Sequence, residues 1–95
     1  MWRTMSDIRV EKALTIGRDA AWAAALKVAE RIKEKAQANY RIVGNAIEFE
    51  RSGAKGKISV SDTHVVAEVS LGLLLRPMRS LIEGKIDEYF TRYFQ

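Results

Sequence analysis

Apolar and polar residues follow two different periods along this chain, and the change of period separates predicted strands from predicted helices. In segment 8–14, Ile8 and Val10 alternate with charged residues, which is typical of a half-buried strand. After Gly17 the apolar residues recur at steps of three and four, which predicts an amphipathic helix. Its stripe consists of Trp22, Leu26, Ala29, Ile32 and Ala36.

Residues 40–71 predict three antiparallel strands connected by tight turns. A two-residue turn at 44–45 aligns apolar residues with apolar residues on one face, and an acid with a base on the other. The predicted pairs are Ile42 with Ile47, Tyr40 with Phe49, and Arg41 with Glu48. A shift by one residue would destroy this agreement, so the pattern indicates the register of the first hairpin.

Segment 49–58, FERSGAKGKI, has two glycines three residues apart among basic residues, a composition that phosphate-binding loops share. Both common phosphate loops lead from a strand into a helix, whereas here a strand follows, so we interpret the segment as a hairpin. A four-residue loop at 53–56 predicts that Phe49 pairs with Val60 and Arg51 with Ile58. The basic side chains at this tip, a candidate anion contact, are Arg51, Lys55 and Lys57.

A second helix is predicted from Pro77 onward, because proline is well tolerated in a first helical turn. Its apolar stripe consists of Met78, Leu81, Ile82, Ile86, Tyr89, Phe90 and Tyr93. The predicted fold is therefore α+β, with the element order β-α-β-β-β-α. We expect a four-stranded antiparallel sheet in the order 2-3-4-1, with both helices packed on its apolar face.

Length and composition indicate one small domain. The chain has 95 residues, no cysteine and a formal net charge of +4. We expect a single domain over residues 1–95, with residues 1–5 as a flexible N-terminal extension. No apolar run approaches the roughly 18 residues of a membrane span, and the first residues lack the apolar stretch of a secretory signal. We therefore expect a cytoplasmic protein.

The sequence lacks the residue clusters that enzymes and metal sites require. His64 is the only histidine, and there is no cysteine to complete a metal site with it. No G-x-S-x-G nucleophile motif is present. Glu48 and Glu50 project from the polar face of the predicted sheet, which offers no pocket for acid–base catalysis. We therefore expect no catalytic, cofactor-binding or metal site, and a protein that is not an enzyme.

Three segments carry a resemblance to a known family. They are YRIVGNAIEFERSGAKGKISV at 40–60, VSLGLLLRPM at 69–78 and IEGKIDEYF at 82–90. Together they resemble the polyhydroxyalkanoic acid system proteins of bacteria, over nearly the whole segment 6–94. The resemblance implies an association with polyester storage granules. It implies no catalytic or ligand-binding residues.

Segment 71–75, LGLLL, places four leucines at the junction between the last strand and the last helix. A strand end and a helix start cannot easily bury all of them, and an exposed apolar patch is a common contact surface. The candidate contact residues are Leu73, Leu74 and Leu75, with Arg76 and Arg79 as a charged rim. Core packing, a homodimer contact and contact with a granule or lipid-like surface stay open as interpretations.

Three functional hypotheses follow. The first is a non-enzymatic accessory protein of polyester storage, whose partner is the granule surface or a granule-associated protein. The second is a module that binds a small hydrophobic ligand, such as an acyl chain or a hydroxyacid derivative; it requires an apolar pocket lined by Tyr40, Phe49, Val69 and Ile86. The third is a nucleic-acid-binding regulator, which the net charge permits and the motifs do not support.

Overall fold

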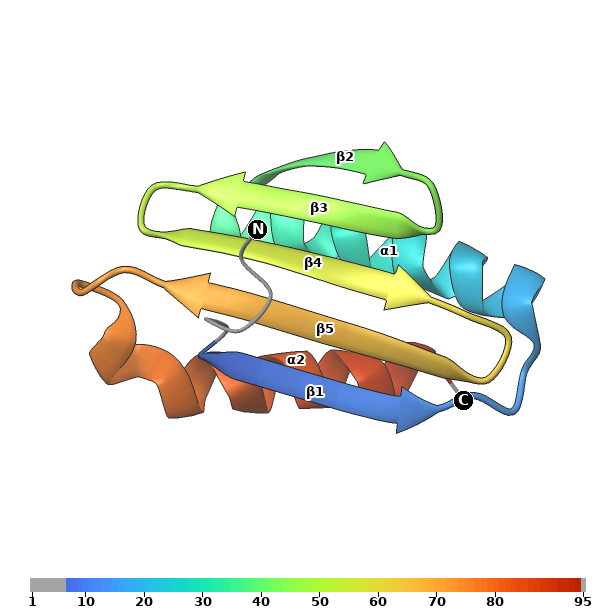
Figure 1. The fold of residues 1–95 in the computed structure, drawn as a ribbon. Helices are drawn as coiled ribbons and strands as arrows, with labels where there is room; N and C mark the ends of the chain where they lie inside the picture. Colours follow the sequence, from blue (N-terminus) through green and yellow to red (C-terminus); the bar gives the residue numbers. More distant parts are fainter. Residues whose placement is uncertain (1–6, 95) are drawn as a thin grey trace.

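The computed structural model of the protein describes residues 7–94 and has an α+β fold, as predicted. The strands are β1 (Ile8–Ala13), β2 (Asn39–Val43), β3 (Ala46–Arg51), β4 (Ala54–Val60) and β5 (His64–Leu71). The helices are α1 (Arg18–Ala36), the short 3₁₀ helix η1 (Arg76–Met78) and α2 (Arg79–Tyr93). The strands form one antiparallel sheet with α1 and α2 on the same face, as predicted (Figure 1). The predicted N-terminal extension, residues 1–5, lies outside the described residues.

The sheet has five strands in the order β1-β5-β4-β3-β2, so the prediction of four strands is wrong. Segment 40–71 contains turns at 44–45, 52–53 and 61–63, and three turns separate four strands instead of three. The first strand nevertheless pairs with the last strand before the C-terminal helix, as predicted. In this pairing of β1 with β5, Ile8 lies opposite Val69.

The two central hairpins agree with the predicted register to different degrees. In the β2–β3 hairpin the three predicted pairs are confirmed. In the β3–β4 hairpin the turn has two residues, Ser52 and Gly53, so Phe49 lies opposite Gly56 and not opposite Val60. Gly53 permits this tight turn because its φ of +88° is one that residues with a side chain rarely adopt. The register differs from the prediction by an even number of positions, so every side chain stays on its predicted face.

Helix α1 lies against the sheet through small side chains. Its buried residues are Ala21, Ala24, Ala25, Val28 and Ala29. The larger residues Trp22, Leu26 and Ile32 are only partly buried and flank this face. The predicted stripe is therefore displaced to one side, because alanines occupy most of the contact and let the helix approach the sheet closely.

Helix α2 is fixed to the rest of the protein near its two ends. Beside its C-terminus Phe90 and Phe94 are buried in the core, with their ring centroids 5.1 Å apart in an edge-to-face arrangement. At its N-terminus, Arg79 Nε donates a hydrogen bond of 2.6 Å to the backbone oxygen of Asp7. Between these anchors the apolar side chains are less completely covered, and Leu81 is 59% exposed.

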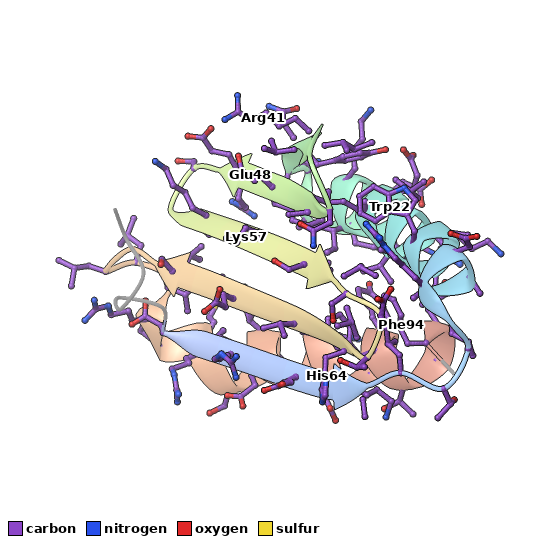
Figure 2. All side chains as sticks on the ribbon, turned by 45° about the vertical axis from the view of Figure 1, so that its right-hand side comes forward. Trp22, Arg41, Glu48, Lys57, His64 and Phe94 are labelled. Atoms are coloured by element: carbon purple, nitrogen blue, oxygen red, sulfur yellow. The ribbon has the colours of Figure 1, made fainter. Side chains whose placement is uncertain are left out.

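The face of the sheet without helices carries a ladder of alternating charge. Its residues, in order across the five strands, are Arg9, Glu68, Lys57, Glu48 and Arg41. Figure 2 shows the side chains of Arg41, Glu48 and Lys57 on successive strands. At the two ends, Arg41 Nη2 lies 3.2 Å from Glu48 Oε1, and Arg9 Nε lies 3.7 Å from Glu68 Oε2. Opposite charges that face each other on neighbouring strands stabilise the sheet.

The assignment of the two faces predicts a large difference between adjacent substitutions in β3. Phe49→Ala should lower the free energy of unfolding by about 3 kcal/mol, because it removes a buried aromatic ring from the core. Glu48→Ala should lower it by less than about 1 kcal/mol, because it removes only partly exposed ion pairs. Urea titration of both variants measures the difference. The opposite order would show that the faces of β3 are wrongly assigned.

Candidate functional site

An apolar cavity of about 560 Å³ lies between the sheet and the two helices. Its walls include Phe49, Ile58 and Val69 from the sheet, Ile32 from α1, and Ile82 and Ile86 from α2. A cavity of this size and apolar character is typical of sites for small ligands. It is therefore the main candidate for a functional site.

The cavity results from the way in which α2 is anchored. Buried Phe90 closes it near the C-terminal end of the helix. Toward the N-terminal end, Leu75, Met78 and Leu81 line it, and of these Met78 and Leu81 are 44% and 59% exposed. The cavity therefore opens beside the start of α2.

The side chains of three basic residues border the cavity: Lys35 from α1, Arg51 from β3 and Lys85 from α2. Arg51 is held in place by hydrogen bonds, since Nη1 donates to the Ala36 oxygen at 3.2 Å and Nε to the Ser52 oxygen at 3.1 Å. Ala36 is the last residue of α1, so Arg51 also binds a carbonyl at the helix C-terminus. Lys85 Nζ lies 3.7 Å from Glu88 Oε1 on the helix surface.

Glu50, Lys55 and Lys57 are also among the residues that line the cavity. Side chains alternate along a strand, and these three residues alternate with Phe49, Gly56 and Ile58 on the cavity face. Their side chains therefore lie on the open face of the sheet. All the charged side chains that line the cavity are consequently basic.

The predicted anion contact at the β3–β4 hairpin is divided between the two faces. Arg51 lies on the helix-covered face, whereas Lys55 and Lys57 lie on the open face, opposite Glu50 and Glu48 on the neighbouring strand. The structure thus does not bring the three basic residues together. On the open face bases and acids alternate along the charge ladder, which does not favour binding to a nucleic-acid backbone.

Two leucines of the LGLLL segment are directed into solvent. Leu73 is 83% exposed and Leu74 is 91% exposed, and we call this pair the leucine tip. Leu75 is partly buried and lines the cavity. It also packs beside Gly53, where a Cβ atom would lie only 3.2 Å from Leu75 Cδ1. The segment therefore combines core packing at Leu75 with an exposed apolar pair.

The two arginines predicted as a rim of the contact surface bind the beginning of the first strand. Arg76 Nη2 lies 3.8 Å from Asp7 Oδ1, and Arg76 Nε donates to the Leu71 oxygen at 3.4 Å. Asp7 Oδ2 accepts a hydrogen bond from the Leu71 backbone nitrogen at 2.7 Å. Together with Arg79, these contacts fasten the start of α2 to β1 and β5.

Tyr40 does not line the cavity, contrary to the prediction. Its ring packs on Phe49 with centroids 6.0 Å apart, and its hydroxyl donates a hydrogen bond to the carboxylate of Glu30. This hydrogen bond raises the pKa of the Tyr40 hydroxyl. On the other side of α1, Arg31 Nε donates to the Tyr93 hydroxyl at 3.3 Å and lowers the pKa of Tyr93. These contacts position α1 against β2 and α2.

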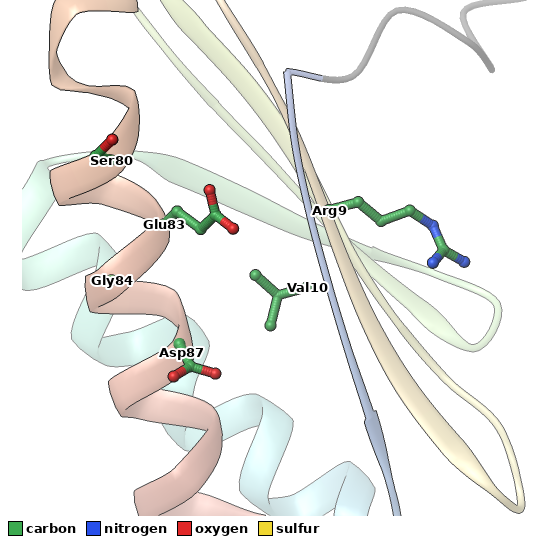
Figure 3. A pocket seen from close by; sticks show the side chains of 6 residues that line it. All are labelled: Arg9, Val10, Ser80, Glu83, Gly84 and Asp87. Atoms are coloured by element: carbon green, nitrogen blue, oxygen red, sulfur yellow. The ribbon is translucent and has the colours of Figure 1, made fainter.

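A second hollow, of about 390 Å³, lies between β1 and α2 (Figure 3). Glu83 and Asp87 extend from α2 on the side of Val10, whereas Arg9 points away from the hollow. Within residues 7–94, no group of three or more histidine, aspartate or glutamate residues could hold a metal ion. His64 lies elsewhere, in contact with Thr63 Oγ1 at 2.9 Å. Neither the second hollow nor the surroundings of His64 bring together a group of residues suited to acid–base or metal chemistry.

Comparison with known proteins identifies one family. A family model described as "Putative polyhydroxyalkanoic acid system protein" matches residues 8–94. No curated protein and no solved structure shows a significant match to the chain. In the part of the chain that the structure describes, no helix is long and apolar enough to cross a membrane.

The different surroundings of the leucines predict different effects of serine substitutions on stability. Leu74→Ser should change the free energy of unfolding by less than about 0.5 kcal/mol, because the side chain is exposed. Leu75→Ser should lower it by about 2 kcal/mol, because it removes contacts with Gly53 and the cavity wall. Thermal unfolding of the two variants provides the comparison. Equal destabilisation would contradict the exposure of the leucine tip.

Proposed function

Because the chain belongs to the family of polyhydroxyalkanoic acid system proteins, we propose that it acts in bacterial polyhydroxyalkanoate storage as a non-enzymatic accessory protein. Its partner is the granule surface or a granule-associated protein, and its place is the cytoplasm at the granule. The family supports the connection with storage, and the exposed apolar surface of the protein supports a role in contact.

The leucine tip is the observation that carries this proposal. Two neighbouring leucines that are 83% and 91% exposed contribute nothing substantial to the core of the protein. Covering them with an apolar surface would release free energy, of about 1.5 to 3 kcal/mol for each leucine that becomes fully buried. The bonds from Arg76 and Arg79 to Asp7 hold the following helix start in place, so the tip is presented from a fixed base.

Removal of the leucine tip should weaken binding to granules. The double variant Leu73→Ser/Leu74→Ser should bind isolated polyhydroxyalkanoate granules at least about tenfold more weakly than the natural protein in co-sedimentation, with unchanged thermal stability. The matched control is Ile42→Ser/Val43→Ser, which removes two other exposed apolar residues, 54% and 47% exposed, from β2. Equal loss in both double variants, or in neither, would contradict a specific contact by the tip.

The same variants distinguish a granule contact from a homodimer. If the leucine tip binds a second copy of the chain, the natural protein is a dimer in sedimentation velocity without granules. The tip variant would then be a monomer. If the natural protein is a monomer and still binds granules through the tip, the homodimer interpretation is wrong.

A second candidate function, the binding of a small hydrophobic ligand, is favoured by the apolar cavity. Of the four residues expected to line such a pocket, Phe49, Val69 and Ile86 do so. The ligand class suggested by the family is an acyl chain or a derivative of a hydroxyalkanoic acid. This function is compatible with the first, since an accessory protein can hold a ligand and contact a granule.

Filling the cavity should prevent ligand binding without unfolding the protein. Ile86→Trp directs a larger apolar group into the cavity, so it should weaken the binding of the uncharged dye Nile red by about tenfold or more. Thr91→Trp is the matched control, because Thr91 is exposed on the same helix and does not line the cavity. Fluorescence titration measures both. Undiminished binding to a folded Ile86→Trp variant would place the dye elsewhere.

A further inference from the structure

The open end of the cavity is formed by segments that are far apart in the sequence. Arg51 lies opposite Ala54, and Ala54 lies opposite Leu71, so these residues share one end of the sheet. The hydrogen bond from Arg51 to Ala36 brings the C-terminus of α1 to the same end. Figure 1 shows that the β3–β4 turn, the end of α1 and the start of α2 all lie on this side of the molecule.

Charge and apolar surface are separated along the cavity. The interior is apolar and closed by Phe90, whereas Lys35, Arg51 and Lys85 provide basic groups at its border. Among residues 7–94, Lys35 has neither an ion-pair nor a hydrogen-bond partner. Arg51 donates from Nε and Nη1 to backbone oxygens, and its Nη2 makes no hydrogen bond with the described residues. Lys35 and Nη2 of Arg51 are therefore available to a negatively charged ligand, whereas Lys85 would share its charge between the ligand and Glu88.

From this arrangement we infer that the cavity binds an alkyl carboxylate, with its chain directed toward Phe90 and its carboxylate between Lys35, Arg51 and Lys85. A carboxylate within the apolar interior would lose its hydration without compensation, so the charged group must stay at the border. There, charge-assisted hydrogen bonds with the basic side chains stabilise it. A hydroxyl group on the chain close to the carboxylate would also lie at the polar border.

This inference rests on the proposed ligand-binding function and specifies which class of ligand the cavity selects. The competing classes are neutral amphiphiles, for which the basic residues are irrelevant, and cationic amphiphiles, which the same residues repel. Three ligands with one chain length and different end groups separate these classes. Octanoate, 1-octanol and octylammonium are suitable, because they differ mainly in charge.

Isothermal titration calorimetry of the full chain with the three ligands tests the inference. Octanoate should bind about fivefold more tightly than 1-octanol, as expected for a partly exposed ion pair, and octylammonium should bind most weakly. In the double variant Lys35→Gln/Lys85→Gln, octanoate should lose most of its preference over 1-octanol, because only Arg51 remains to bind the carboxylate. The affinity for 1-octanol should stay unchanged.

The matched control is Lys27→Gln/Lys33→Gln, which removes the same charge from exposed positions of α1 that do not line the cavity. This variant should keep the preference for octanoate. If 1-octanol binds as tightly as octanoate to the natural protein, or if the preference is undiminished in Lys35→Gln/Lys85→Gln, the carboxylate inference is overturned while hydrophobic ligand binding stands. If none of the three ligands binds, both are overturned, and the proposed contact with granules is unaffected.

Discussion

The burial of Phe90 and Phe94 determines the shape of this protein beyond the core to which they belong. These two rings hold the C-terminal end of α2 against the sheet, while Arg76 and Arg79 fasten its other end to Asp7. Between these two ends, Ile82 and Ile86 are only partly buried. The apolar cavity, its opening beside Leu81 and the position of the leucine tip all depend on these two anchors.

The two helices do not cover the sheet equally closely. Helix α1 approaches closely because its buried face consists mainly of alanines, and it completes the core above the central strands. Helix α2 carries larger side chains, of which only Phe90 is buried. Leu75, which directly follows the leucine tip in the chain, lines the resulting space, so a surface bound by the tip would be close to the opening of the cavity. The two candidate functions therefore use one end of the molecule.

Much of the fold follows from local patterns in the sequence. Alternation predicted the two faces of the sheet, and the pairing of Arg41 with Glu48 predicted the first hairpin, because both depend on residues close in the chain. The length of the second turn was less determined by the sequence, because Gly53 and Gly56 both permit tight turns. The predicted and the observed register of the β3–β4 hairpin differ by an even number of positions, so both keep the apolar residues on one face and the pattern does not distinguish them. The predicted number of strands was wrong because segment 40–71 contains three turns, and three turns separate four strands.

The candidate site was less predictable than the fold. The exposed pair Leu73 and Leu74 was found in the sequence, since a junction cannot bury so many leucines. Lys35 and Lys85 were missed, although each lies three residues after an apolar residue that lines the cavity, Ile32 and Ile82. Such spacing puts a basic group beside an apolar stripe on any amphipathic helix. Only the position of α2 relative to the sheet, which depends on distant contacts, shows that these stripes border a cavity.

The charge ladder has a consequence for the two unpaired edges of the sheet. A row of alternating charges across an odd number of strands begins and ends with the same sign, and here both ends are arginines, Arg9 on β1 and Arg41 on β2. If two copies joined edge to edge with their rows aligned, any combination of edges would place two arginines opposite each other. Like charges on neighbouring strands are destabilising, and exposed edge strands are the usual route to uncontrolled sheet extension. With four strands the two ends of the row would carry opposite charges; with five strands the row disfavours aligned edge-to-edge pairing.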